Sequence, residues 1–490
     1  MNHKKSKWSL FKCFSALVLT LVMVLSLFSE PIWASETIRL NFYITNPYAD
    51  VDCDTVNHFR AALHVHTTHS HSSADMPDII RDHYLKGFDI LAITDHDVLT
   101  LGWDRFPVGN LRNPISIITS EEKQSIYAGT WDGPRPSGSA FTGSRQQQNG
   151  MISIPASNEQ SRGQHLLTFW APFNNMVGDS LEDNLQWAER LGGVSIIVHK
   201  GRYTEGRAGG EDGLARSNDR DIIERYVELY FQFPSLLGME IFNRFDHYTR
   251  SDRVLWDNIL METMPFGRNV FGFSNDDSHG MDESGYNFNV LLMPVLHERY
   301  ARVAMESGAF YAVTRVARHD NATTPGIHAP TLPNGDRTPN IGNALTAQML
   351  LYMTTPSIAR ITAEDNVITI LGRDYDRIDW IADGVIIHRG SYLYIPDFWE
   401  MINHNYVRAQ LVSESGLAFT QPFGVFLICR VILYPDDGKT GVTVPDLPGC
   451  HTYGNTTADA LFMAKDAMER TKGVFANRKL TKSRLMAVFK

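Results

Sequence analysis

The sequence predicts a mixed α/β protein whose N-terminal part forms an α/β barrel and whose C-terminal third is rich in β-strands. Three observations lead to this fold class. Residues 61–94 have the pattern of a strand, a helix and a buried strand, and the same alternation returns between residues 151 and 314. Histidines and acids stand at or near the ends of successive strands. Ligand-type side chains at the carboxyl ends of parallel strands are typical of the active face of an α/β barrel.

The first strand of this unit carries an unusual group of histidines. Seven of the chain's eighteen lie between His58 and His96. A short apolar run at residues 61–65 includes His64 and is followed by His66, and the spacing of two places both side chains on one face of an extended strand.

A helix and a second strand complete the unit. Asp75 occupies an N-cap position, Pro77 falls in the first turn, and Gly87 follows the last turn, so the pattern predicts a helix between them. The continuous apolar run at residues 88–94 predicts a fully buried strand. That strand delivers Asp95 and His96 at its C-terminal end.

Further along the chain, ligand-type residues recur at or near each predicted strand. Residues 99–150, rich in Gly, Pro, Ser and Gln, are interpreted as a long insertion over the active face. Mixtures of imidazole and carboxylate suit Zn, Mn or Fe at the two- or three-metal sites of hydrolases. The candidate ligands in chain order are His64, His66, His96, Glu159, His165, His199, Asp277 and His279.

This order resembles the PHP (polymerase and histidinol phosphatase) family of metal-dependent phosphoesterases. The family's first motif, His-x-His-Thr-x-x-Ser-Asp, corresponds to residues 64–71, and its second, Thr-Asp-His, to residues 94–96. His71 departs from the pattern, because the family more often has an aspartate there. A histidine can bind a metal in place of an aspartate but brings no negative charge. We include His71 among the ligands as the weakest assignment, with a non-ligand role equally open.

The resemblance spans roughly residues 40–320. It implies a distorted TIM-like (β/α)7 barrel over residues 36–324 that holds two or three divalent ions, Mn, Zn or Fe. Glu159 would correspond to the glutamate that bridges the metals. The histidine after that glutamate, the third-motif histidine and the fourth motif would correspond to His165, His199, and Asp277 with His279.

Two residues are expected to act on the reaction rather than bind metal. Asp95, beside His96, is placed to orient an imidazole or to take a proton. Arg202 is our choice for holding the substrate phosphate through its planar fork, with Lys200 as the alternative. The sequence has no GxSxG elbow and no catalytic Cys/His signature that would indicate another class of hydrolase.

Other residues of these types have different interpretations. Glu240 is either a further member of the site or a buried acid paired with Arg244. Asp276 is expected to support or cap rather than to bind metal. The three histidines not expected to be ligands are His58, His69 and His83.

The first 34 residues are interpreted as a secretory signal, with an uncleaved anchor as the alternative. Four lysines precede an apolar run from Phe14 to Phe28, and a small residue, Ala34, ends the segment. The run is short for a membrane span, which needs about 20 residues. We therefore expect an exported, secreted or surface protein. The net charge of −10 argues against general nucleic-acid binding.

The C-terminal third is expected to contain two further units and a tail. After a linker at residues 325–340, short alternating strands predict a sandwich-like accessory domain at residues 340–423. Residues 426–472, with the stretch VPDLPGC, resemble the HicB-type antitoxin domain, a ββα module that binds a toxin partner. Residues 473–490 are interpreted as a basic, solvated tail. This C-terminal segment supplies none of the candidate ligands.

Two functional hypotheses follow. The first is hydrolysis of a small phosphorylated substrate by a metal-activated water. The second is a protein that binds metal or a ligand without turnover, because His71 weakens one metal position. The sequence does not distinguish a nucleotide, a sugar phosphate and a phosphodiester as substrates.

Overall fold

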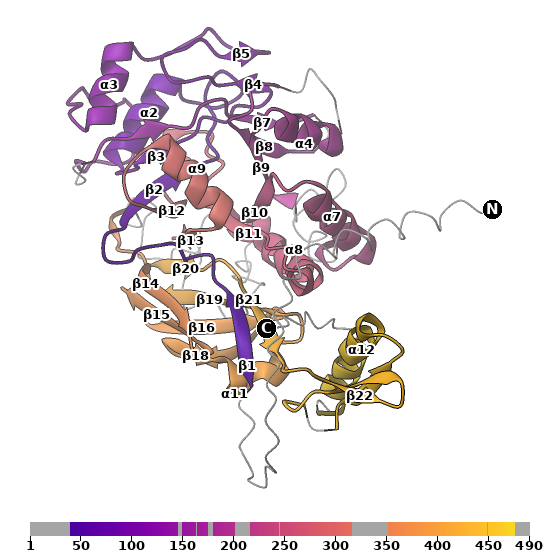
Figure 1. The fold of residues 1–490 in the computed structure, drawn as a ribbon. Coiled ribbons are helices and arrows are strands. Elements are labelled where there is room, and N and C mark those ends of the chain that lie inside the picture. Colours follow the sequence, from indigo (N-terminus) through magenta and orange to yellow (C-terminus); the bar gives the residue numbers. More distant parts are fainter. Residues whose placement is uncertain are drawn as a thin grey trace.

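The computed structural model has an α/β half, a β-rich half and a small C-terminal module (Figure 1). The predicted signal at residues 1–34, the linker at 325–340, Arg202 and most of the predicted basic tail lie outside the described residues. In the part of the chain that is described, no helix is long and apolar enough to cross a membrane. The structure describes residues 40–145, 149–162, 164–174, 180–200, 216–244, 246–315, 351–447 and 449–475.

The predicted strand–helix–strand unit at the start of the α/β half is confirmed. Strand β2 (Asn57–Ala62) leads into helix α2 (Met76–Leu85), whose N-cap Asp75 accepts a hydrogen bond from the backbone N of Asp78. Gly87 follows the helix with a φ of 82°, a left-handed conformation that glycine adopts without strain. Strand β3 (Ile90–Leu91) then pairs in parallel with β2.

Two sheets make up the α/β half. Strand β3 pairs in parallel with β6 (Ile152–Ser153), which completes one edge of the larger sheet. The second sheet has the order β11-β10-β9-β8-β7. Its strands β9, β10 and β11 are parallel, whereas β7 and β8 run antiparallel to their neighbours. The bounds are β7 Asn158–Gln160, β8 Leu166–Phe169, β9 Val194–Ile197, β10 Leu236–Asn243 and β11 Phe271–Asn275.

The predicted distorted TIM-like (β/α)7 barrel is not confirmed. Single bridges, His96 to Glu159 and Val65 to Ser278, are what join the two sheets at the end where the candidate ligands lie. Strand β6 ends the larger sheet and β7 ends the second, and the two do not pair. The antiparallel β7–β8 hairpin also interrupts the parallel order that a barrel of βα units requires. The architecture is mixed α/β.

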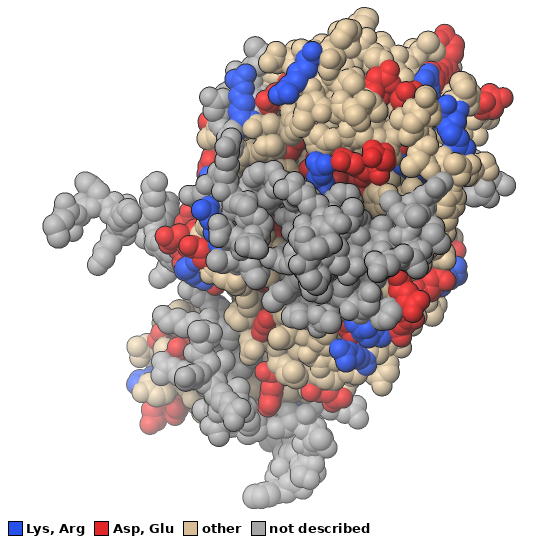
Figure 2. All heavy atoms as spheres, turned by 180° about the vertical axis from the view of Figure 1, so that it is seen from behind, with Lys and Arg blue, Asp and Glu red and all other residues tan. Residues whose placement is uncertain are grey.

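Helices pack against both sheets. The helices of the second sheet are α4 (Leu181–Arg190), α7 (Arg220–Gln232) and α8 (Asp246–Thr263). Within the insertion expected at residues 99–150, a hairpin of β4 (Val98–Leu99) and β5 (Val108–Gly109) precedes helix α3 (Ser120–Ala128). The insertion is therefore partly regular structure. On the face seen in Figure 2, acidic and basic side chains are interspersed over the described surface.

The larger sheet runs from the α/β half into the β-rich half. Strand β12 (Asn287–Met293) pairs with β2, and β13 (Phe310–Thr314) pairs with both β12 and β20 (Gly416–Phe419). Helix α9 (Glu298–Ser307) connects β12 to β13. The order then continues through β19 (Tyr406–Ser413) and β21 (Phe423–Ile428) to β1 (Asn41–Thr45).

The position of β1 differs from expectation. The segment falls within residues 36–324, the range expected for the barrel, but it pairs antiparallel with β21 over its full length, from Asn41 opposite Ile428 to Thr45 opposite Gly424. Figure 1 shows this indigo strand among the orange strands of the C-terminal half. The expected boundary between residues 423 and 426 falls inside β21.

The strands expected in residues 360–420 are present. A three-stranded sheet of β14 (Ser357–Glu364), β15 (Val367–Arg373) and β18 (Tyr392–Tyr394) lies beside β16 (Arg377–Ala382) and β17 (Val385–Arg389). Helix α11 (Ile395–Phe398) follows β18. Buried residues of both groups, such as Ile368 and Trp380, belong to one hydrophobic cluster.

The C-terminal module has one more strand than predicted. Strands β22 (Ile432–Asp436), β23 (Lys439–Thr443) and β24 (His451–Gly454) form an antiparallel sheet, followed by helix α12 (Thr457–Phe475). The ββα prediction lacked β24. Buried residues of the module, including Val444 and Met468, share the large hydrophobic cluster of the main body. The module is therefore packed on the rest of the chain.

Candidate metal centre

The candidate site lies where several strands end and the backbone turns sharply. His199, Arg244 and Asp277 have φ values of 35°, 49° and 48° and follow β9, β10 and β11. Residues other than glycine rarely adopt this left-handed conformation, which is costly and concentrates at functional sites. Because each strand ends in such a turn, the following side chains are directed back across the ends of the sheet.

Glu159, fully buried on β7, stands at the centre of the site. Its Oε2 lies 3.3 Å from Nε2 of His64, 3.3 Å from Nε2 of His66 and 2.7 Å from Nδ1 of His96. Its Oε1 lies 2.8 Å from Nδ1 of His165 and 3.3 Å from Nε2 of His199. The two oxygens of one carboxylate therefore face two different sets of imidazoles.

Asp277 is the second carboxylate of the site. Its Oδ1 lies 2.9 Å from Nε2 of His66 and 3.3 Å from Nε2 of His64. His279 packs against the same group, with its ring centroid 4.3 Å from that of His66. Nδ1 of His279 is 2.8 Å from the backbone oxygen of Asp277, so a proton on Nδ1 would leave Nε2 free to face the cluster.

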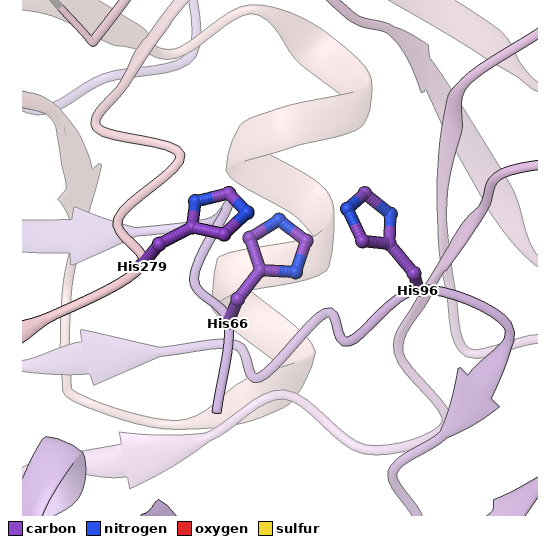
Figure 3. Close-up of side chains that lie close together, drawn as sticks. All are labelled: His66, His96 and His279. Carbon is purple, nitrogen blue, oxygen red and sulfur yellow. The ribbon is translucent and has the colours of Figure 1, made fainter. Parts of the chain in front are cut away.

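Eight of the nine predicted ligands can be grouped into triads of a size that could hold a metal ion. In each triad one possible ligand atom per residue lies within 4.8 Å of the others. Figure 3 shows the rings of one triad converging from three different segments. The triads are His66, His96 and His279; His64, His66 and Glu159; His64, His199 and Asp277; and His96, Glu159 and His165.

The bonding of the innermost atoms fits a cation. Oε2 of Glu159 and Nε2 of His64 are buried, and neither has a hydrogen-bond partner among the described residues. The imidazoles near Oε2 approach it without the geometry of a hydrogen bond, and coordination of a metal would satisfy this buried oxygen. Imidazole nitrogens and carboxylate oxygens are together the ligands of Zn, Mn and Fe sites.

Glu240 on β10 holds His64 in place. Its Oε1 lies 2.8 Å from Nδ1 of His64, and the side-chain amides of Asn243 and Asn275 donate to its two oxygens at 2.8 and 2.9 Å. The alternative pairing with Arg244 is not observed. Because a hydrogen bond at Nδ1 fixes the tautomer and the ring orientation, it presents Nε2 of His64 to the cluster.

His71 lies near the cluster but outside the triads. Its ring stacks on His96 at 4.7 Å and meets His279 at 4.3 Å, and the residue is exposed. Partial burial, with His279 and His96 nearby, lowers the pKa of His71 to about 4. At neutral pH this side chain is therefore uncharged and sits at the mouth of the site.

The side-chain hydrogen bonds of Asp95 are made with the loop that follows His66, and its predicted catalytic role stays a prediction. The backbone N and the Oγ1 of Thr67 donate to it at 2.7 and 2.6 Å, and Oγ of Ser70 donates at 2.5 Å. These bonds tie down the loop between His66 and His71. Asp95 thus positions this loop and makes no contact with an imidazole of the triads.

The structure describes one of the two residues that we expected to hold the substrate phosphate. Arg202 lies outside the described residues, so its role stays a prediction. Lys200 is buried, and its burial lowers the pKa of the ammonium group to about 7. Arg244, which we had considered only as a partner of Glu240, instead lies beside His279, with Nη1 3.3 Å from Nδ1.

The carboxylates of the site are ionised. Burial alone would raise the pKa of Glu159, but the surrounding imidazoles, chiefly His96 and His64, outweigh burial and hold it well below its usual value. The same balance, with His64 foremost, holds the pKa of Asp277 well below its usual value. Burial lowers the pKa of His199 to about 3, which leaves a neutral imidazole suited to metal binding.

His83, His69 and Asp276 make contacts outside the triads. His83 lies within α2, with Nδ1 2.8 Å from the backbone oxygen of Ile79. Nε2 of His69 accepts a hydrogen bond from the backbone N of Ser116, away from the cluster. Asp276 accepts hydrogen bonds from the backbone N atoms of residues 285–287 and so caps that turn.

Fold and site together define a mixed α/β protein with a cluster of histidines and carboxylates that could hold divalent metal ions. No model of a known protein family matches the sequence, and no curated protein is detectably similar to it. The HicB-type resemblance of residues 426–472 is therefore unsupported.

Solved structures give weak likenesses. One is a two-domain protein from Bacteroides vulgatus containing a predicted PHP-like metal-dependent phosphoesterase, at a TM-score of 0.38 and 10% identity over 81% of this chain and 92% of that one. Another is the lesion-specific endonuclease PfuEndoQ from Pyrococcus furiosus, at 0.28 and 14% over 51% of this chain and 56% of that one.

Proposed function

We propose that this protein hydrolyses a phosphoester with the help of divalent metal ions bound at the candidate metal centre. The observation that carries the proposal is the position of Glu159. One oxygen faces His64, His66 and His96, and the other faces His165 and His199. A single carboxylate between two sets of ligands is the arrangement needed to hold two ions close together.

The ligands divide around Glu159 and Asp277. By their distances to Glu159, His64, His66 and His96 would serve the Oε2 side, and His165 and His199 the Oε1 side. Two of the triads, His64–His199–Asp277 and His96–Glu159–His165, combine residues from both sides. When bound, two such ions supply a hydroxide-like water at neutral pH and offset the negative charge on the phosphoryl oxygens. The motif resemblance at residues 64–71 and 94–96 supports the same reaction.

The charge of the site favours an anionic substrate. Two divalent ions would bring four positive charges, whereas Glu159 and Asp277 contribute one negative charge each. His71 adds no charge, because its pKa is about 4. A loaded centre would therefore keep net positive charge at its mouth, where it attracts a phosphate group.

The second hypothesis, metal binding without turnover, rests on His71. A neutral imidazole in place of an aspartate leaves one position without an anionic ligand, and a metal there would be held less tightly. Measuring metal content and phosphoester hydrolysis on one protein sample distinguishes the two hypotheses.

The test combines metal analysis with a panel of phosphoesters. The full-length chain is freed of metal, reloaded with Mn²⁺, Zn²⁺ or Fe²⁺, and assayed on phosphomonoesters and phosphodiesters alongside Asp277→Asn and the control Asp104→Asn. Asp104 is a surface acid 2.8 Å from Lys123. We expect turnover that Asp277→Asn reduces at least about 100-fold and the control leaves unchanged, since a ligand makes the nucleophile available. A loaded wild-type chain that hydrolyses none of these esters contradicts the proposal and favours binding without turnover.

A further inference from the structure

Arg244 lies beside the triads, with Nη1 3.3 Å from Nδ1 of His279. It follows β10 directly, and the left-handed turn at this residue, with a φ of 49°, redirects the chain over the end of the sheet. The turn is fixed on both sides, because the backbone N of Arg244 donates to the oxygen of Asn275 at 3.3 Å and its backbone oxygen accepts from Nδ2 of Asn287 at 2.6 Å. A strained, fixed backbone that presents an arginine beside a metal-ligand candidate calls for a functional reason.

Glu283 fixes the guanidinium relative to His279. Nη2 of Arg244 donates to Oε1 of Glu283 at 2.8 Å, and the backbone N of His279 donates to Oε2 of the same carboxylate at 2.8 Å. Glu283 therefore links the cation and the candidate ligand through its two oxygens.

The guanidinium of Arg244 has N–H groups that are not used by Glu283. Its short contact with Nδ1 of His279 is not a strong hydrogen bond, since that nitrogen also lies 2.8 Å from the backbone oxygen of Asp277 and would donate its proton there. Of the five N–H groups of an arginine, one is used by Glu283 among the described contacts. The side chain of Arg244 is 24% exposed, so part of it is accessible to a soluble ligand.

We propose that Arg244 binds the non-bridging oxygens of the substrate's phosphate group, and that Glu283 is the positioning residue that holds Arg244 for this contact. The proposal rests on the proposed function and adds the substrate-binding group to it. A planar guanidinium donates to phosphate through two parallel N–H groups, which a lysine cannot reproduce. Arg244 thus recognises the anionic part common to phosphoesters.

Binding of inorganic phosphate to the metal-loaded full-length chain tests the proposal without requiring turnover. Calorimetry would compare wild type with Arg244→Gln, Arg244→Lys and Glu283→Gln. The matched control is Arg81→Gln, because Arg81 is 27% exposed and pairs with Glu122 at 2.7 Å, on the α2–α3 side of the molecule. Metal content and melting temperature are measured on every sample.

We expect Arg244→Gln to weaken phosphate binding about 10- to 100-fold, the range for a lost charge-assisted hydrogen bond, with metal content unchanged. Arg244→Lys should recover only part of the loss, and Arg81→Gln should bind as wild type does. In any assay with turnover, the Arg244 variants should raise KM more than they lower kcat.

A double-mutant cycle tests the role of Glu283. If Glu283 acts through Arg244, Glu283→Gln weakens phosphate binding in the wild-type background and has no further effect in Arg244→Gln. The proposal is overturned if metal-loaded wild type binds no phosphate, if Arg244→Gln binds it as tightly as wild type, or if the variant loses metal. Failure of the proposed function would give a different result. If phosphate binding depends on Arg244 but no ester is hydrolysed, the proposed reaction is wrong and the phosphate-binding role of Arg244 still holds.

Discussion

Glu240 and His64, 176 positions apart in the sequence, meet in the interior with Oε1 2.8 Å from Nδ1. Both side chains are fully buried, and the contact directs the other ring nitrogen of His64 toward Glu159 and Asp277. The orientation of a candidate ligand thus depends on a residue that no motif includes.

Replacing Glu240 by glutamine should weaken metal binding without unfolding the protein. Losing the partner of a metal-binding histidine typically costs about 10- to 100-fold in metal affinity. Titration of the apo-protein with Zn²⁺ against a competing chelator measures this. Glu262→Gln, which alters a surface acid 2.5 Å from Arg220, is the control. Equal affinities of Glu240→Gln and wild type would show that the contact does not support a metal ligand.

Metal binding should release protons at neutral pH. Burial tends to lower the pKa of His64, but Asp277, Glu159 and Glu240 outweigh burial and raise it well above the usual value. His64 therefore carries a proton when no metal is bound, and a metal must displace that proton, so affinity increases as pH rises and falls in acid. Calorimetry in two buffers of different ionisation enthalpy measures the release. Identical binding enthalpies in the two buffers would contradict this charge state.

Two truncations should have different effects. Ending the chain at Phe423 removes most of β21, which lies between β1 and β19, and we expect the remainder not to fold stably. Ending it at Arg430 removes only the C-terminal module, including Val444 and Met468 of the large hydrophobic cluster.

For the truncation at Arg430 we expect metal content to be retained and the melting temperature to fall by several degrees, because apolar surface buried at about 25 cal/mol per Å² becomes exposed. Thermal melts and metal analysis of both chains test the pair of predictions. A stable, metal-binding chain ending at Phe423 would mean that the pairing of β1 with β21 is dispensable.

The ion pair of Arg408 and Asp257 should be important for stability. Arg408 on β19 is fully buried and donates to both oxygens of Asp257 on α8, at 2.9 and 2.7 Å. Arg408→Gln leaves the carboxylate buried without its countercharge, which typically costs about 3–5 kcal/mol in the free energy of unfolding.

The control is Arg220→Gln, which breaks exposed pairs with Glu224 and Glu262 and should cost about 0–1 kcal/mol. Urea denaturation gives both values. Similar losses for the two variants would mean that burial adds nothing to the Arg408 pair.

The candidate ligands were predictable because each stands in a short local pattern. His64, His66 and His96 lie at the ends of apolar runs. Such a run predicts a buried strand, and the histidine at its end predicts a metal ligand at the end of that strand. The N-cap of α2 at Asp75 was predictable for the same local reason.

Contacts between distant segments were not predictable in this way. The strand pattern of residues 39–45 indicates β1 but carries no information about β21 as its partner. The distorted barrel is not confirmed, because β6 and β7 lie in separate sheets, and the sequence of each strand does not indicate its partner. The catalytic role of Asp95 stays a prediction, and its bonds to Thr67 and Ser70 depend on a loop fold that the motif does not encode.

The central claim is that Glu159 separates two sets of metal ligands. The most direct measurement is a crystal structure of the Mn²⁺-loaded protein with anomalous scattering, together with the metal content of Glu159→Gln. We predict an ion on each side of Glu159, one near His64 and His66 and one near His165 and His199, and a clear loss of bound metal in the variant. Anomalous peaks elsewhere in the protein, or full metal content in Glu159→Gln, would contradict the account.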